Sequence, residues 1–208
     1  MRKKSSNISL KNTKDTKLSI QFNLDGFSFC ISNIANNNTL YFSEYQFSET
    51  QLTPENLLLE VEEIFKKDTN LQHDFSNVTV IHQNNLSTLV PNKYLNFNIK
   101  TLATDFITFD EIDNMDAKNV YVPYVNINNY LFQNFGEFEY KHHISVLLKK
   151  LLETTNTVEK TMFVNVSKAS LDLVVLQNNK LLFSNSFSFE TKEDFIYYIL
   201  FVAEQLEL

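Results

Sequence analysis

The chain has only two glycines, Gly26 and Gly136, among its 208 residues. Average usage is about 7% glycine, which would put roughly fifteen in a chain of this length. A Walker loop, a Rossmann fingerprint and a kinase glycine-rich loop each need two or three closely spaced glycines. The sequence therefore excludes all three phosphate-binding loops. Asparagine is abundant and arginine scarce, which is typical of an AT-rich genome, so part of the glycine deficit is expected to be mutational drift.

The composition is otherwise that of an ordinary globular chain, with 43% hydrophobic and 21% charged residues. Such a chain can bury a core without disulfides or metal, as one domain or as two small lobes. The net charge is −7 and the lysines are scattered, so no basic stripe for nucleic acid is predicted. No apolar run is long enough for a membrane-spanning helix, and no signal-peptide pattern follows the start. We therefore expect a cytoplasmic protein without membrane insertion.

Alternation of apolar and polar residues predicts three strands near the start, over 18–24, 27–31 and 40–47. Asp25-Gly26 predicts a type I′ hairpin turn between the first two. Thr53-Pro54 predicts the start of a helix, with threonine as N-cap and proline at the first helical position. The order of elements is β-β-β-α.

The end of the chain repeats this order, with strands predicted over 161–166, 171–176 and 181–189. Thr191 to Asp194 resembles a capping box and predicts a helix that continues to Leu206. Between the two repeats, the pattern predicts strands over 77–82 and 120–123 and helices over 127–135 and 144–152. Residues 1–15 are polar and are predicted to be a disordered lead-in.

The two β-β-β-α units align at a nearly constant offset. Asn23-Leu24 falls on Asn165-Val166 at an offset of 142, and residues 40–43 fall on 181–184 at an offset of 141. Few residues are identical, so the matching order of elements is the stronger sign of an internal repeat.

A duplicated β-β-β-α unit resembles the actin-like ATPase superfamily, which includes actin, Hsp70 chaperones and sugar kinases. Residues 18–20, 25–29, 88–91 and 193–198 also resemble a bacterial family known as a domain of unknown function. The resemblance implies an α/β fold with mixed sheets and actin-like, ribonuclease H-like lobes. It implies a first lobe over 16–158 and the start of a second over 159–208. The superfamily's second lobe normally continues further, so we expect an exposed apolar patch on the last helix.

The resemblance also implies a nucleotide between the lobes, with an aspartate near the metal in the turn after each lobe's first strand. Asp25 and Gly26 occupy that place in the first unit. The second turn, Ser167-Lys168-Ala169-Ser170, has neither glycine nor aspartate. Close backbone approach to phosphate needs the missing Cβ of glycine. Asp25-Gly26 is therefore either a plain hairpin turn or half of a nucleotide site holding ATP with magnesium.

The other candidate side chains favour structural roles. The acidic group Asp105, Asp110, Glu111, Asp113 and Asp116 lacks the glycine of a calcium loop and predicts a solvated loop. His142-His143 are adjacent and badly placed to share a metal ion, so no metal site is predicted.

Two further predictions concern single side chains and the aromatic residues. Cys30 is the only cysteine and is expected to be a buried small side chain. The aromatic residues are expected to pack in the core, although Phe187, Phe189, Tyr197 and Tyr198 are candidates for a partner surface.

The sequence favours a non-catalytic scaffold without cofactor that binds a protein partner, by analogy in a bacterial assembly or envelope-linked complex. The alternative is a magnesium-dependent ATPase or kinase with Asp25 near the metal. A weaker alternative is a protein that binds a small molecule or peptide in a cleft between the lobes. The absence of glycine-rich phosphate loops favours the first hypothesis.

Overall fold

The computed structural model describes residues 2–7, 15–47, 53–95, 106–156 and 158–208. The chain divides into two compact units, each made from two stretches of sequence. The first unit contains residues 1–84 and 123–143, and the second contains 85–122 and 144–208. The boundary expected at 158/159 therefore falls inside the second unit. The chain leaves the first unit after residue 84, residues 85–122 pack with residues 144–208, and residues 123–143 belong to the first unit again.

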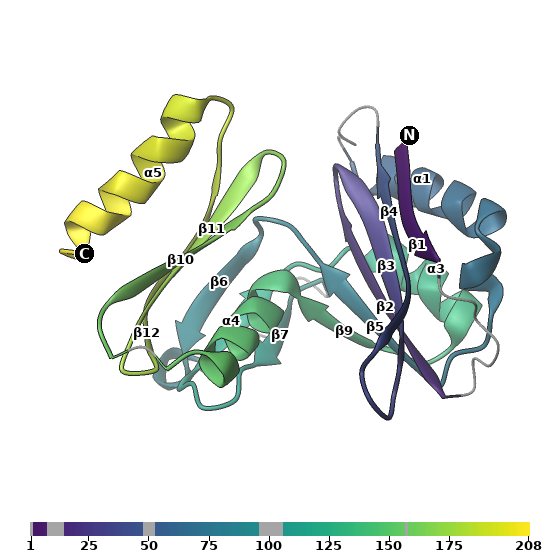
Figure 1. Ribbon diagram of the computed structural model, residues 1–208, viewed down its shortest axis with the longest axis horizontal. Coiled ribbons are helices and arrows are strands. Elements are labelled where there is room, and N and C mark those ends of the chain that lie inside the picture. The colour runs from purple at the N-terminus through teal and green to yellow at the C-terminus, as the bar shows by residue number, and fades with distance from the viewer. Residues whose placement is uncertain (1, 8–14, 48–52, 96–105, 157) are drawn as a thin grey trace. The chain divides into compact units, whose positions relative to one another are not determined.

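The first unit is a six-stranded mixed sheet in the order β1-β4-β3-β2-β5-β9 (Figure 1). β2, β3 and β4 form an antiparallel meander, whereas β5 runs parallel to β2 and β9 parallel to β5. The strands are β1 (Arg2–Asn7), β2 (Thr16–Asn23), β3 (Gly26–Asn33), β4 (Thr39–Gln46), β5 (Asn77–His82) and β9 (Glu139–His142).

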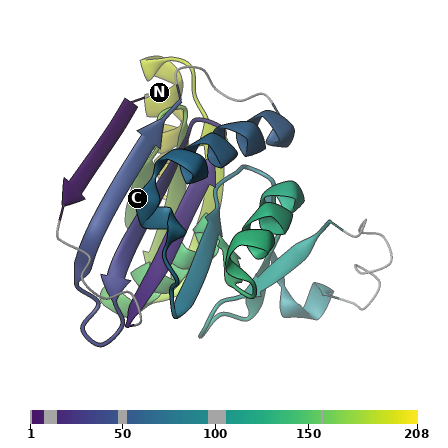
Figure 2. The same cartoon turned by 90° about the vertical axis from the view of Figure 1, so that its right-hand side faces the viewer.

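Helices α1 (Pro54–Lys67) and α3 (Val125–Phe135) both contribute to this unit's core (Figure 2). A short 3-10 helix (Thr69–Gln72) follows α1. Alternation along the strands sends one side chain in two to the core, and this cluster includes Leu18, Ile20, Phe22, Phe27, Phe29, Ile31, Leu57, Val61, Ile64, Val80, Ile127 and Leu131. The same alternation gives the core positions to Phe29 and Ile31, so Cys30 is only partly buried, which corrects the expectation of a buried thiol.

The start of the chain differs from the disordered segment predicted from its polarity. Arg2–Asn7 forms the edge strand β1, which pairs antiparallel with β4 from Arg2–Gln46 to Asn7–Tyr41. Main-chain hydrogen bonds make such a pairing, and they leave no hydrophobic signal in the sequence. Residues 8–14 of the predicted segment lie outside the described residues.

The described residues of the second unit form two three-stranded sheets and the helices α4 and α5. One sheet has the order β6-β8-β7 and the other the order β10-β11-β12. The elements are β6 (Ser87–Pro91), a 3-10 turn (Asn92–Tyr94), β7 (Thr108–Glu111), β8 (Ala117–Tyr121), α4 (His143–Thr154), β10 (Thr161–Val166), β11 (Ser170–Gln177), β12 (Lys180–Ser188) and α5 (Lys192–Gln205).

Strand β11 is buried on both faces, which explains its nearly continuous apolar sequence. On one face, Val174 and Leu176 pack with Ile144 and Leu148 of α4. On the other face, residues 171, 173 and 175 pack against α5. Figure 1 shows α5 lying along this sheet.

The predicted order β-β-β-α occurs in both places, as β2-β3-β4-α1 and as β10-β11-β12-α5. The predicted helix starts are confirmed, because the Thr53 side chain caps α1 and Thr191 with Asp194 forms the capping box of α5. Gly136 ends α3 with a positive φ of 72°. The mixed α/β fold class is therefore confirmed.

Candidate functional site

The carboxyl ends of three parallel strands, β2, β5 and β9, meet at one edge of the first unit's sheet. In open α/β sheets, ligands commonly bind beside this edge. Polar residues gather there at the strand ends and just beyond them, namely Asn23, Asp25, His82, Gln83, Asn84 and His142. This carboxyl edge is therefore a candidate site.

Gln83 connects β5 to β2 through several hydrogen bonds. Its Oε1 accepts from Gln21 Nε2 at 2.8 Å and from Asn23 Nδ2 at 3.1 Å. Its backbone N–H donates to the carbonyl of Phe22 at 3.1 Å. The amide is thus held in place by its own sheet.

His82 is fully buried at the end of β5 and is held from both sides of its ring. The backbone N–H of Tyr124 donates to its Nδ1 at 3.1 Å, so the proton lies on Nε2, which donates to Asn128 Oδ1 at 3.0 Å. Burial lowers the pKa of His82 to about 4, and the bond to Asn128 opposes this shift. His82 is therefore a neutral residue that fixes the start of α3 to the sheet.

Tyr124 and His142 complete the hydrogen bonds of the edge. The Tyr124 hydroxyl donates to the carbonyl of Gln83 at 3.4 Å, and burial raises its pKa to about 12. His142 Nε2 donates to the carbonyl of Asn84 at 3.1 Å. These polar groups bond chiefly to one another, as is typical of a structural network.

The turn between β2 and β3 differs from the predicted type I′ turn. Asn23 pairs with Gly26, so Leu24 and Asp25 are the central residues, and neither has a positive φ. Gly26 is needed for another reason, because a Cβ there would lie 2.7 Å from the carbonyl oxygen of Tyr45. The backbone of Asp25 also bonds within the unit, through its N–H to Asn23 Oδ1 and its carbonyl to the N–H of Phe47.

The corresponding turn of the second repeat joins β10 to β11 and closes on itself. The Ser167 N–H donates to the carbonyl of Ser170 at 2.8 Å. Asn165, which the repeat aligns with Asn23, donates to Asp172 Oδ2 at 2.8 Å. The first strand of each repeat thus has a neutral amide at its last position (Asn23) or one position before it (Asn165), and magnesium sites are usually built on carboxylates.

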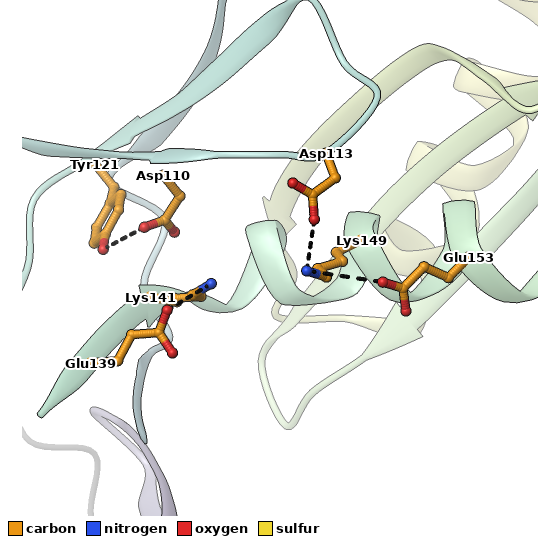
Figure 3. Close-up of polar contacts among 7 residues, drawn as sticks. All are labelled: Asp110, Asp113, Tyr121, Glu139, Lys141, Lys149 and Glu153. Atoms are coloured by element: carbon orange, nitrogen blue, oxygen red, sulfur yellow. Dashed lines mark hydrogen bonds and ion pairs between the residues drawn. The ribbon is translucent and has the colours of Figure 1, made fainter. Parts of the chain in front are cut away.

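Acidic residues that were predicted to lie together in one solvated loop instead contact separate partners. Asp110 lies in β7 and accepts from the Tyr121 hydroxyl at 3.1 Å, and Lys118 contacts Glu111. Asp113 pairs with Lys149, whose ammonium also lies 4.0 Å from Glu153 (Figure 3). Asp105 lies outside the described residues. Within the described part of the chain, no group of three metal-binding side chains comes together.

A pocket of about 450 Å³ lies in the first unit beside the C-terminal end of α1. Its lining includes the apolar side chains of Phe65 and Leu71, the ring of Tyr130, and the polar side chains of His73 and Asp74. The pocket is large enough for a small molecule. No sequence pattern indicated this pocket, because its lining residues come from 65–78 and from 130–135, which are far apart in the chain.

The outer face of α5 is the most apolar exposed surface among the described helices. It consists of Ile196, Tyr197, Leu200 and Phe201, which are 44–62% exposed. The predicted apolar patch on this helix is therefore present. Of the predicted partner residues, Tyr197 lies on this face, whereas Phe187, Phe189 and Tyr198 pack between α5 and the sheet. Ile196, Leu200 and Phe201 were missed because the helix is apolar on all sides.

Comparison with known proteins supports the resemblance found in the sequence. A family model described as "Protein of unknown function (DUF3822)" matches residues 5–208. No curated protein matches the chain. No described helix has the length and hydropathy that a membrane span requires.

Two solved structures are similar to almost the whole chain. A Bacteroides thetaiotaomicron protein with an actin-like ATPase fold and unknown function is 21% identical, with a TM-score of 0.75 over 94% of this chain and 79% of the other. The PilM-PilN type IV pilus biogenesis complex is 12% identical, with a TM-score of 0.52 over 95% and 67% of the two chains. These likenesses show an actin-like ATPase fold.

Proposed function

Because this chain belongs to the DUF3822 family of proteins of unknown function and has an actin-like fold, we propose that it is a non-catalytic scaffold that binds a protein partner. The outer face of α5 carries this proposal. Its four large apolar side chains are exposed on a helix whose other side packs on β11. A contiguous apolar patch on a folded protein is typical of a binding surface.

The state of the carboxyl edge and of the two turns supports the non-catalytic part of the proposal. Gln83, His82 and Tyr124 are committed to internal hydrogen bonds. The turn after β10 has no glycine, so its backbone cannot approach a phosphate closely. We propose no cofactor and a cytoplasmic location, and a partner in an assembly complex, by analogy with the PilM-PilN complex.

A magnesium-dependent ATPase or kinase with Asp25 near the metal is the competing function. A thermal-shift titration with magnesium and ATP separates the two. At about 1 mM ATP, a site with a Kd of about 10 µM would stabilise the fold by roughly 2.7 kcal/mol. For a chain of this size, that corresponds to a rise in Tm of roughly 5–10 °C.

We expect no rise in Tm with ATP, either for the wild type or for Asp25→Ala. A rise in the wild type that disappears in Asp25→Ala would contradict the proposal and support the enzyme. ADP with magnesium serves as a second probe, because a site of this kind could also hold the product of ATP hydrolysis.

The binding part of the proposal is tested by comparative co-purification from the native cells. The wild type is compared with a double variant of the outer face, Leu200→Ser/Phe201→Ser, and with Leu59→Ser, which replaces an exposed leucine on α1. We expect a stoichiometric partner with the wild type and with Leu59→Ser, but not with the double variant. A partner that stays with all three proteins would show that binding does not use α5.

A further inference from the structure

The outer face of α5 has a regular arrangement of apolar and acidic residues. Positions 200 and 201 follow positions 196 and 197 by one helical turn, so the four side chains lie on one side of the helix. The rings of Tyr197 and Phe201 stack with their centroids 5.7 Å apart, so part of the surface is ordered without a partner.

Carboxylates border this apolar surface at both ends. Glu193 lies one turn before Tyr197, and Glu204 lies one turn after Leu200, and both glutamates are exposed. Glu190 and Glu207, just outside the helix, are exposed as well. The only basic residue of the helix is Lys192. The nearby Lys160 donates to the backbone carbonyl of Leu206.

We propose that the outer face of α5 binds a basic amphipathic helix of a partner protein. The apolar side chains of that helix would cover Leu200 and Phe201, and its lysines or arginines would face Glu193 and Glu204. Helix packing against an apolar helical face is a common mode of peptide recognition, and complementary charges at the rim set its orientation. This inference rests on the proposed function and adds the chemistry of the partner.

The charges disfavour the two other natural occupants of such a face. In a dimer of two copies through α5, glutamates would face glutamates in either orientation of the helices, and like charges across an interface are destabilising. A membrane surface is usually anionic and is bound by helices rich in lysine and arginine. The acidic border of α5 would be repelled by it.

Binding of two synthetic helical peptides to the full-length chain tests the inference by fluorescence anisotropy. Both peptides have leucine at the same helical positions, and the polar positions are lysine in one and glutamate in the other. We expect the leucine/lysine peptide to bind at least tenfold more tightly at low salt. The difference between the peptides should shrink as salt screens the charges.

Two double variants with matched controls locate the binding. Leu200→Ser/Phe201→Ser should weaken the leucine/lysine peptide tenfold or more, whereas Leu59→Ser and Phe132→Ser, at equally exposed apolar positions of the first unit, should leave its affinity unchanged. Glu193→Lys/Glu204→Lys should reverse the preference between the peptides. Glu63→Lys/Glu137→Lys changes the net charge by the same amount far from α5 in sequence and should not reverse it.

Several results would overturn the inference. If Glu63→Lys/Glu137→Lys weakens binding as much as Glu193→Lys/Glu204→Lys, the peptide responds only to net charge. Tighter binding of the leucine/glutamate peptide, or of anionic phosphatidylglycerol vesicles, would contradict the acidic recognition. So would a neutral-pH dimer in sedimentation that Leu200→Ser/Phe201→Ser dissociates.

The partner found by co-purification distinguishes this failure from failure of the proposed function. A partner that is lost with Leu200→Ser/Phe201→Ser but is retained with Glu193→Lys/Glu204→Lys would leave the scaffold function intact and refute the basic helix. If no partner depends on the outer face of α5, or if ATP stabilises the chain through Asp25, the proposed function itself fails.

Discussion

At the scale of single residues, His82 links the stability of the first unit to pH. Its folded-state pKa of about 4 lies below the value of 6.5 for an exposed histidine, because its charged form would be buried. Between these two pH values the unfolded chain binds a proton that the folded chain does not bind. The free energy of unfolding therefore falls as pH falls through this window, by about 1.4 kcal/mol per pH unit from this group.

Urea unfolding of the wild type and of His82→Gln at pH 7 and pH 5 measures this contribution. We expect the wild type to lose about 2 kcal/mol from this group between the two conditions. His82→Gln should be less stable at pH 7, because the Tyr124 N–H loses its acceptor, but it should lose less on acidification. An equal loss in both proteins would show that His82 is not responsible.

Residue patterns predicted helix caps better than they predicted the β2–β3 turn or buried polar contacts. Thr53, Thr191 and Gly136 act within a few residues of themselves, so their roles could be identified from the sequence. The bonds of His82 to Tyr124 and Asn128 join residues more than forty positions apart. Gly26 was assigned to the turn because its real constraint, the carbonyl oxygen of Tyr45, lies on another strand, 19 positions further along the chain.

At the scale of elements, a tight two-residue turn joins β11 to β12. Asn178 and Asn179 have φ angles of 50° and 56°, and the flanking Gln177 pairs with Lys180. Positive φ at both central positions defines a type I′ turn, which asparagine tolerates and glycine prefers. We expect Asn179→Gly to raise the free energy of unfolding by about 0.5 kcal/mol, as measured in urea.

Asn179→Val is the opposing variant, because a β-branched residue rarely adopts positive φ. It should lower the free energy of unfolding by about 1–2 kcal/mol. If both variants had the same stability as the wild type, the turn would not constrain this hairpin.

Strands and helices with an apolar period were predicted close to their observed bounds, whereas β1 was not. Its residues, Arg2–Asn7, are polar and contribute main-chain pairing to β4. Of the exposed apolar residues of α5, Tyr197 was a candidate for the partner surface, whereas Ile196, Leu200 and Phe201 were predicted only as part of the helix. Periodicity identifies a helix, but it cannot assign the two faces of a helix that is apolar all round.

At the scale of the whole molecule, the first unit has a hydrophobic core of its own, and each unit is built from two separate stretches of sequence. In the described part of the chain, the core cluster of the first unit includes no residue from 85–122 or beyond 143. The segment 85–122 begins and ends at neighbouring points, because the Val122 N–H donates to the carbonyl of Leu86 at 3.0 Å. The order of elements in the sequence could not show that residues 85–122 leave the first unit and that the chain then returns to it. The boundary was therefore predicted after residue 158, just before the second β-β-β-α repeat.

This arrangement predicts that the first unit folds without the second. Residues 1–84 joined to 123–143 through a linker of about four glycine and serine residues should unfold cooperatively and give a dispersed NMR spectrum. A linker of this length is sufficient, because the two ends that it joins lie close together: the Tyr124 backbone N–H donates to His82 Nδ1. The same chain with Leu57→Ala should lose about 2–5 kcal/mol and serves as the control for a packed core. A broad, non-cooperative transition would show that the first unit needs the second to hold its structure.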